Sequence, residues 1–264
     1  MSALAHEGIP LDIFRVVHLP TRDLHGFLIE LRDVPRTLVE VFKVLTESGI
    51  KILRCFIYSK DGAEVILLCD ITKMKFDLRM VEDGIRKLEG VKSLISIKQF
   101  RPGFFIDYVN FPLTISEKRV VMLDLDELRG FVKDIRDEWG SAGDVFCYYS
   151  GLNIGRCIWR GYESILEALS PPDKFELVGH IFKAYGFGRM EVVKVDVKAP
   201  SATLRFYELF ECLIGRPSKK PYSQLMRGIL ATIAARVFDR EMYVREVMCI
   251  AKGDPFCEFN IYSR

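Results

Sequence analysis

The sequence predicts an α+β protein of two domains, each built around an antiparallel sheet with helices packed on it. The chain has 264 residues, and at roughly 150 residues per domain this length fits two modest domains. Hydrophobic residues make up 49% and charged residues 28%, as is ordinary for a globular protein with a buried core. A segment rich in proline, glycine and aromatic residues at 101–119 separates the halves. We therefore expect domains at 1–102 and 103–264.

The first domain is expected to follow the order βαββαβ after a short strand at 11–20. β-branched and aromatic residues dominate its strand segments. Apolar residues recur at helical spacing behind Thr37, which stands in position to cap that helix. The Asp61-Gly62 pair between two β-rich runs predicts a hairpin. The expected elements are a strand at 25–33, a helix at 37–49, a hairpin over 51–71, a helix at 77–89 and a strand at 91–100.

The segment LIELRDVPRTLVEVFKVLTESGIKI at 28–52 resembles the ACT domain. It has the family's strand ending in Asp33, a short turn, a helix, and a Gly-Ile pair before the next strand. The resemblance covers about residues 25–100. It implies a ferredoxin-like sandwich with a regulatory role, in which exposed sheet edges join two copies into a homodimer. The chain departs from the family at Arg36, where members that bind amino acids usually carry glycine.

Arg36 leaves two interpretations open for this domain. Glycine at a helix start lets a carboxylate approach the backbone N–H groups, whereas an arginine side chain crowds that approach and can itself clamp an anion. The first interpretation is a small ligand, such as an amino acid, bound by Asp33, Arg36 and Thr37. The second is a structural or dimerising domain that binds no ligand.

The second half predicts an α/β domain in which helices pack on an antiparallel sheet. Proline and glycine punctuate it, because Pro171-Pro172 stops a long apolar helix and Gly186 ends the next one. The expected elements are a strand-like run at 120–123, helices at 126–139, 146–168 and from 173, two strands within 190–213, a helix at 224–238, and two strands flanking 252–255.

The closing segment LMRGILATIAARVFDREMYVREVMCIAKGDPFCEFNI at 225–261 resembles the 4-vinyl reductase-like domain. It combines a glycine-containing helix, a strand with Glu246, and then Cys249, a Gly-Asp pair and Cys257 before a last aromatic strand. The resemblance extends over about 105–264 and implies a hydrophobic ligand cavity, usually within a homodimer. The family is related in fold to TRAPP vesicle-tethering subunits and to sensor domains of bacterial activators that respond to aromatic compounds.

The helix at 146–168 is the expected wall of this cavity, facing the sheet. A glycine in a helix interior costs about 1 kcal/mol, so Gly151 and Gly155 indicate either close packing or a pocket wall. The aromatic candidates for the wall are Phe146, Tyr148, Trp159, Phe182 and Tyr185. Aromatic residues at helical spacing are also typical of plain core, and both interpretations stay open.

Glu246, Cys249 and Cys257 have the spacing E-x2-C-x7-C, which makes them candidate ligands of a zinc ion. Zinc favours four ligands in a tetrahedron. The resemblance implies a further cysteine 23 residues before the glutamate, where this chain has Ser223, a poor ligand. Cys212 is expected to reach the site only after a loop rearrangement. The alternatives are an open three-ligand site, or two buried thiols without a metal.

The sequence indicates a protein that is not an enzyme. It contains no G-x-S-x-G elbow, P-loop or dinucleotide fingerprint. The net charge of +2 creates no long-range field that would attract nucleic acid, and no apolar run reaches the roughly 18 residues of a membrane span. Seven scattered cysteines do not form a disulfide framework, which favours reduced thiols in the cytoplasm.

We therefore expect a cytoplasmic homodimer that senses an apolar or aromatic small molecule and regulates without catalysing a reaction. One alternative is a tetrapyrrole-binding or vinyl-reductase accessory protein, because the family name derives from reduction of a vinyl group in chlorophyll synthesis. Another alternative is a scaffold related to TRAPP subunits that binds no ligand.

Overall fold

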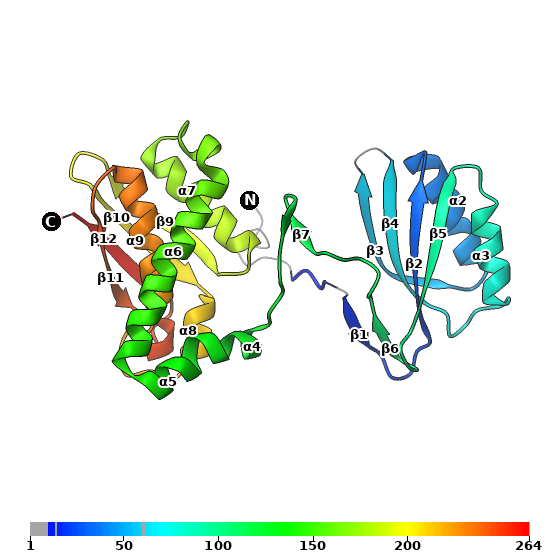
Figure 1. The fold of residues 1–264 in the computed structure, drawn as a ribbon, viewed down its shortest axis with the longest axis horizontal. Coiled ribbons are helices and arrows are strands. Elements are labelled where there is room, and N and C mark those ends of the chain that lie inside the picture. Colours follow the sequence, from blue (N-terminus) through cyan, green and yellow to red (C-terminus); the bar gives the residue numbers. More distant parts are fainter. Residues whose placement is uncertain (1–9, 14, 60–61, 264) are drawn as a thin grey trace. The chain divides into compact units, whose positions relative to one another are not determined.

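The computed structural model describes residues 10–13, 15–59 and 62–263. It has the α+β class expected from the sequence, with helices and antiparallel sheets in both halves (Figure 1). The chain divides into two compact units, Met1–Val121 and Met122–Arg264. Each unit has a four-stranded sheet of its own. Among the described residues, no helix is both long and apolar enough to cross a bilayer.

The N-terminal unit has the expected order βαββαβ. Its elements are β2 (Leu24–Leu31), α2 (Val34–Glu47), β3 (Lys51–Ser59), β4 (Ala63–Asp70), α3 (Leu78–Arg86) and β5 (Val91–Lys98). The strands pair antiparallel in the order β3-β4-β2-β5, and both helices cover one face (Figure 1). Lys60 and Asp61 of the expected hairpin turn lie outside the described residues.

Alternating side chains decide what each face of this sheet buries. The face under the helices buries a cluster that includes Phe27, Ile29, Leu31, Val41, Leu45, Val65 and Ile85. The opposite face buries a smaller cluster around Phe105. A Cβ added at Gly26 would lie 2.6 Å from the Cζ of Phe105. Glycine is therefore needed in β2 for this ring to pack on the sheet.

Residues 103–121, which the sequence places at the start of the second domain, group with the N-terminal unit. Strand β6 (Phe104–Ile106) pairs antiparallel with β1 (Val16–His18), and β7 (Thr114–Ile115) pairs with β8 (Lys118–Arg119). Since Phe105 is also buried in this unit, both strand pairing and apolar burial hold the segment there.

Helix α2 begins before the cap expected at Thr37. Asp33 precedes the helix and Pro35 lies in its first turn, where the missing N–H of proline costs no helical hydrogen bond. Thr37 is consequently inside the helix and buried, with its side chain packed against Gly90. The prediction that Thr37 caps the helix is wrong.

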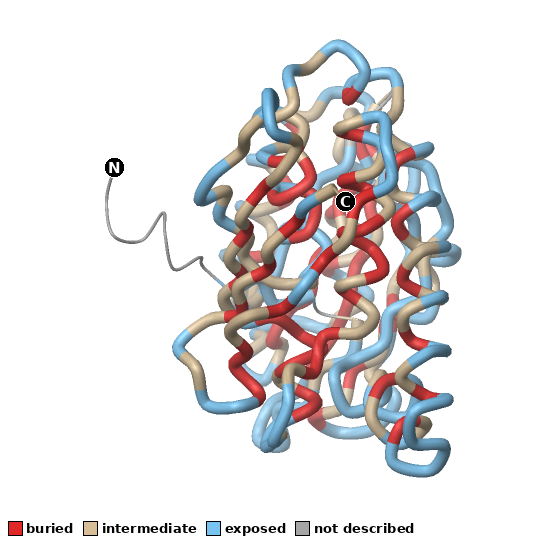
Figure 2. The backbone as a smooth tube through the Cα atoms, turned by 90° about the vertical axis from the view of Figure 1, so that its left-hand side faces the viewer, coloured by how far each residue is buried: buried red, intermediate tan, exposed pale blue. Residues whose placement is uncertain are grey.

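The C-terminal unit packs helices on the sheet β11-β12-β10-β9, whose neighbouring strands are all antiparallel. Its helical elements are α4 (Leu125–Arg129), the π-helical turn η1 (Gly130–Asp134), α5 (Ile135–Trp139), α6 (Ser141–Leu166), α7 (Pro171–Ala184), α8 (Phe210–Gly215), α9 (Gln224–Phe238) and the 3-10 turn η2 (Ile250–Lys252). Its strands are β9 (Arg189–Asp196), β10 (Ser201–Tyr207), β11 (Tyr243–Met248) and β12 (Cys257–Tyr262). Buried positions, red in Figure 2, recur along these elements.

Helices α6 and α9 pack with direct contact between their backbones. A Cβ added at Gly151 would lie 2.1 Å from the carbonyl oxygen of Leu225, and one at Gly228 would lie 2.1 Å from that of Tyr148. Gly155 meets the backbone of α9 in the same way. These glycines therefore permit a close helix–helix approach that no side chain would allow.

Two segments differ from their expected secondary structure. Residues 120–123 form no strand, and residues 208–213, expected at the end of a strand, turn into α8. Glu208 adopts a left-handed φ of 54° after β10, and the Cys212 N–H then donates to the Leu209 carbonyl at 3.0 Å. The change of direction creates a short helix that contributes to two sites.

Candidate functional site

An apolar cavity of about 640 Å³ lies in the C-terminal unit. Its wall is formed by α4, η1, α6, the turn after α7, α8 and the start of α9. The lining residues are Leu123, Asp124, Leu125, Leu128, Phe131, Val132, Phe146, Cys147, Ser150, Ile154, Tyr185, Gly186, Phe187, Phe210 and Leu225. Aliphatic and aromatic side chains make up most of this surface, as in typical small-molecule sites.

The wall offers a ligand few polar side chains. Asp124 is the one charged residue among the described residues of the wall, and its carboxylate caps α4 by accepting the Glu127 N–H at 2.8 Å. Ser150, Tyr185 and Cys147 supply two hydroxyls and a thiol. Burial raises the pKa of Cys147 to about 11, so this thiol is neutral at pH 7. The cavity therefore suits an apolar molecule with one or two hydrogen-bonding groups.

Phe146 and Tyr185, two of the expected wall residues, do line the cavity. The structure places Trp159 and Phe182 in the hydrophobic core instead, and the backbone of Tyr148 lies where α6 meets α9. Because a helix turns once in about 3.6 residues, one side of α6 borders the cavity while the other packs on α9. Gly151 and Gly155 lie on that packing side, as described above.

The sequence interpretation missed several wall residues. Leu125, Leu128 and Phe131 recur every three residues, a helical pattern that was visible in the sequence. Phe187 and Phe210 come from a turn and from the unexpected helix α8, and their ring centroids lie 5.3 Å apart. Only the three-dimensional structure brings this second pair to the cavity.

The rim of the cavity carries exposed aromatic rings. Phe131 and Phe146 belong to the wall, yet 61% and 46% of their surface is exposed. The Trp139 ring meets Phe146 edge to face, with centroids 6.4 Å apart. The rim is therefore an apolar surface that a ligand contacts on entry.

A second cluster in the same unit gathers three thiols and a carboxylate. Cys212 of α8, Glu246 of β11, Cys249 after β11 and Cys257 of β12 place one ligand atom each within 4.8 Å of all the others. The Sγ of Cys212 lies 3.4 Å from that of Cys249 and 3.5 Å from that of Cys257. It lies 3.8 Å from the Oε1 of Glu246. All four residues are buried.

These separations fit the edges of a zinc tetrahedron. Zinc–sulfur bonds of about 2.3 Å place two tetrahedral sulfur ligands about 3.8 Å apart. Cysteine sulfur and glutamate oxygen are both ligands that zinc takes. Cys212 completes a set of four because α8 directs its thiol into the cluster. The expectation that Cys212 needs a loop rearrangement is wrong.

Ser223 supports the cluster from the start of α9. Its Oγ donates to Glu246 Oε1 at 2.8 Å, and its N–H donates to Glu246 Oε2 at 2.9 Å. The same Oγ lies 2.9 Å from the Sγ of Cys212. Ser223 therefore orients the carboxylate in the way that outer partners orient metal ligands.

Hydrogen bonds among the thiols favour a negative charge in the cluster. The hydrogen bond from Cys212, with another from Cys257, holds the pKa of Cys249 far below its usual range. The same contact raises the pKa of Cys212, which acts as the donor. Burial raises the pKa of Glu246 to about 8. A divalent cation that binds here therefore meets one thiolate and displaces protons from the remaining groups.

Glu211 lies next to Cys212 in α8 and is completely buried. Its carboxylate accepts the N–H groups of Leu225 and Met226 at 2.9 and 2.8 Å, and Arg136 Nη1 lies 3.4 Å away. Burial raises the pKa of Glu211 to about 7. The carboxylate thereby satisfies the first N–H groups of α9, which have no partners within the helix.

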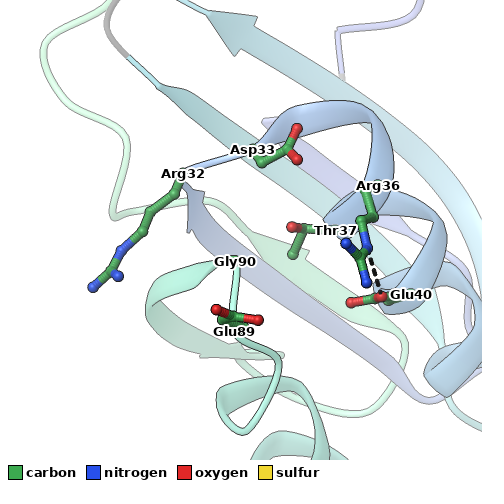
Figure 3. A pocket seen from close by; sticks show the side chains of 7 residues that line it. All are labelled: Arg32, Asp33, Arg36, Thr37, Glu40, Glu89 and Gly90. Atoms are coloured by element: carbon green, nitrogen blue, oxygen red, sulfur yellow. Dashed lines mark ion pairs between the residues drawn. The ribbon is translucent and has the colours of Figure 1, made fainter.

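Asp33, Arg36 and Thr37 lie together in a pocket of about 300 Å³ in the N-terminal unit (Figure 3). The full lining is Arg32, Asp33, Arg36, Thr37, Glu40, Glu89 and Gly90. Arg36 and Glu40 point toward one another, with Nε and Oε1 3.6 Å apart. Three carboxylates against two guanidinium groups give the lining a net charge of −1. An anionic ligand gains no net attraction from such a pocket.

The comparisons with known proteins agree with the closing sequence signature. The family model of the vinyl-4-reductase domain matches residues 203–262, which include all four ligands of the thiol cluster. The C-terminal unit therefore contains a domain of this family. The chain is also 30% identical over 129 residues to the uncharacterised protein MJ1642 of Methanocaldococcus jannaschii, a match that covers 48% of this chain and 70% of that protein. The chain belongs to the same family as MJ1642.

Two solved structures extend the comparison. The phenol-responsive sensory domain of the transcription activator PoxR, crystallised with phenol, matches 56% of this chain and 78% of its own, with 16% identity and a TM-score of 0.52. The two proteins share a fold. The ACT domain of the GTP pyrophosphokinase of Chlorobium tepidum matches 29% of this chain and 100% of its own, with 23% identity and a TM-score of 0.26.

Proposed function

We propose that the protein is a non-catalytic regulator that binds an apolar or aromatic small molecule in the cavity of its C-terminal unit and acts as a homodimer. The cavity itself carries this proposal, because about 640 Å³ is bounded by a wall with one charged residue. Burial of a ligand's apolar surface there contributes about 25 cal/mol per Å². The shared fold with the phenol-responsive domain of PoxR supports the aromatic class.

The charges of the wall favour a neutral ligand. Asp124 is a carboxylate and no cation faces it from the described wall, so an acid would leave water without an ionic partner at a cost of several kcal/mol. A neutral aromatic alcohol meets the hydroxyls of Ser150 and Tyr185 instead. The ligand class that fits best is therefore an uncharged aromatic or alicyclic molecule with a hydroxyl group.

Filling the cavity tests this proposal. Ile154 lines the wall, so Ile154→Trp should abolish the binding of 2-naphthol, measured by isothermal titration calorimetry. Ile165→Trp is the matched control, because Ile165 lies on the same helix but is 56% exposed and outside the cavity. We expect the wild type and the control to bind equally. Equal binding by all three proteins would place the ligand elsewhere and contradict the proposal.

We further propose that Cys212, Glu246, Cys249 and Cys257 hold one zinc ion as a structural centre. When bound, zinc would link α8 to β11 and β12, and its binding free energy would add to folding stability. The seven cysteines are all free thiols, which supports a reducing compartment such as the cytoplasm.

Elemental analysis of protein purified in the presence of zinc tests the metal. One equivalent per chain is expected in the wild type and in Cys69→Ser, a change at a buried thiol of the N-terminal unit. Cys257→Ser should lose most of the zinc. The zinc proposal fails if Cys257→Ser retains as much metal as the other two proteins.

We propose that the N-terminal unit joins the two copies through the outer edge of β3. No described strand pairs with this edge, and Ile57 and Tyr58 are 47% and 59% exposed along it. An unprotected apolar edge is a template for another strand, and two identical antiparallel edges are complementary about a two-fold axis. The other edge strand, β5, exposes Lys92 and Lys98, which oppose such pairing.

Light scattering after size exclusion tests this interface. Ile57→Lys on β3 should yield monomers, whereas Ile95→Lys on β5, at a position 44% exposed, should leave the dimer intact. The charged pocket at the start of α2 has a structural role in this proposal. A wild-type monomer, or a dimer in Ile57→Lys, would contradict the interface.

A further inference from the structure

Helix α8 links the apolar cavity to the thiol cluster. Three consecutive residues of this short helix have three roles. Phe210 lines the cavity, Glu211 accepts N–H groups at the start of α9, and Cys212 belongs to the cluster. Because α8 has six residues, a rotation that moves one of these side chains moves all three.

Phe210 passes any movement of α8 to the cavity wall. Its N–H donates to the Phe187 carbonyl at 3.0 Å, and the two rings have centroids 5.3 Å apart. Phe187 in turn stacks on Phe182 of the core at 5.7 Å. The position of Phe210 therefore decides the shape of one side of the cavity.

Glu211 provides a second connection to the same wall. It is fully buried and accepts the Leu225 N–H at 2.9 Å, and the side chain of Leu225 lines the cavity. A buried carboxylate cannot abandon such donors without a large desolvation cost. A displacement of α8 therefore also displaces the first turn of α9 or breaks these hydrogen bonds.

We propose that Cys212 is a positioning residue, and that a metal ion bound to its thiol fixes α8 and thereby pre-organises the cavity for its ligand. The inference rests on the proposed function, because it requires both the cavity ligand and the metal. A pre-organised wall spares the ligand the cost of ordering Phe210 on binding. Linkage requires that the ligand tighten metal binding by the same factor.

The place of the thiol in the chain matters for this coupling. Ser223 lies beside Cys212, with 2.9 Å between Oγ and Sγ, so a thiol at position 223 also reaches the cluster. The start of α9 is already held there by two hydrogen bonds from Ser223 to Glu246. A metal bond from position 223 would therefore leave α8 unattached.

Calorimetric titration of 2-naphthol into the full-length protein tests the proposal in the wild type. We expect the dissociation constant to rise about fivefold or more when zinc is removed with a chelator, the usual lower range for coupled sites. Zinc affinity, measured by competition with a chelator, should rise by the same factor when 2-naphthol is saturating. Equal affinities with and without zinc would overturn the inference while leaving both sites intact.

The other failures are distinguishable from this one. A wild type that binds zinc but no 2-naphthol contradicts the cavity ligand, and one that binds 2-naphthol but no zinc contradicts the metal. Either result also overturns the coupling, because the coupling needs both. The reciprocal wild-type measurement does not depend on whether any variant folds.

A swapped variant separates positioning from metal binding. Cys212→Ser combined with Ser223→Cys keeps three thiols and Glu246 in the cluster, so it should bind zinc, as read from the sulfur-to-metal absorption of its cobalt form. Zinc should then change its 2-naphthol affinity by less than twofold. Cys157→Ser, which changes an exposed thiol outside the cluster, should retain the full wild-type factor. A swapped variant that binds zinc and also keeps that factor would overturn the role of Cys212.

Discussion

The two units carry pockets of opposite character. The cavity of the C-terminal unit has about 640 Å³ and one charged residue in its described wall, whereas the pocket at α2 has about 300 Å³ and five charged residues among seven. The Arg36 side chain in the smaller pocket is 82% exposed, so solvent screens its charge. Apolar burial keeps its full strength in the larger cavity.

This difference teaches where ligand affinity can arise in the molecule. A cavity bounded by Leu128, Phe187 and Phe210 gains free energy from nearly every apolar atom that it removes from water. The exposed pair of Arg36 and Glu40 is worth at most about 1 kcal/mol. The C-terminal unit is accordingly the binding part in our proposal, and the N-terminal unit is the part that associates.

The largest expected effect sharpens the distinction between the cavity wall and the core behind it. Phe182 is fully buried and contacts the rings of Phe187 and Phe206 at 5.7 and 6.0 Å between centroids, so Phe182→Ala should lower the free energy of unfolding by about 4 kcal/mol. Phe146→Ala, at the exposed rim, should cost less than about 1 kcal/mol but weaken 2-naphthol binding. Chemical denaturation and calorimetry measure the two quantities. Similar losses of stability in both variants would contradict the assignment of Phe146 to the rim.

The next effect distinguishes the units by their response to acid. Burial lowers the pKa of His25 in β2 from 6.5 to about 4, so below pH 6.5 the unfolded chain binds a proton that the folded unit excludes. Stability of the N-terminal unit should therefore fall as the pH drops from about 6.5 to 4, by up to about 3 kcal/mol. Hydrogen exchange of β2 at both pH values measures this fall. His25→Phe should reduce it, and an unchanged acid response in that variant would exclude His25 as its source.

The smallest expected effect concerns the charged pocket. Arg36→Ala removes an exposed ion pair with Glu40, so it should change the free energy of unfolding by no more than about 0.5 kcal/mol. Thermal unfolding with and without free amino acids should show no ligand-dependent difference between this variant and the wild type. A shift in melting temperature that amino acids cause only in the wild type would make this pocket a binding site and break the contrast between the units.

Local patterns were sufficient to predict the regular elements. The helix expected at 224–238 has those bounds in the structure, and the strand expected at 25–33 spans Leu24–Leu31. Apolar periodicity and turn residues are local properties, so a single sequence carries them. The same patterns identified Glu246, Cys249 and Cys257 as neighbours.

Contacts made by chain reversals could not be predicted in this way. Cys212 joins the cluster because Glu208 takes a left-handed conformation and starts α8, and a glutamate gives no signal for that conformation. The wall residues of α6 depended on the rotation of that helix, which its glycines set by contact with α9. Tertiary packing decided both features.

The ring contact between Trp139 and Phe146 has a practical consequence. The chain contains two tryptophans. Trp159 is 4% exposed within the core, whereas Trp139 is 54% exposed beside a ring of the cavity wall. A molecule entering past Phe146 changes the polarity around one indole and leaves the other shielded. The protein thus contains its own optical reporter of cavity occupancy, and its native emission can follow ligand entry without a dye.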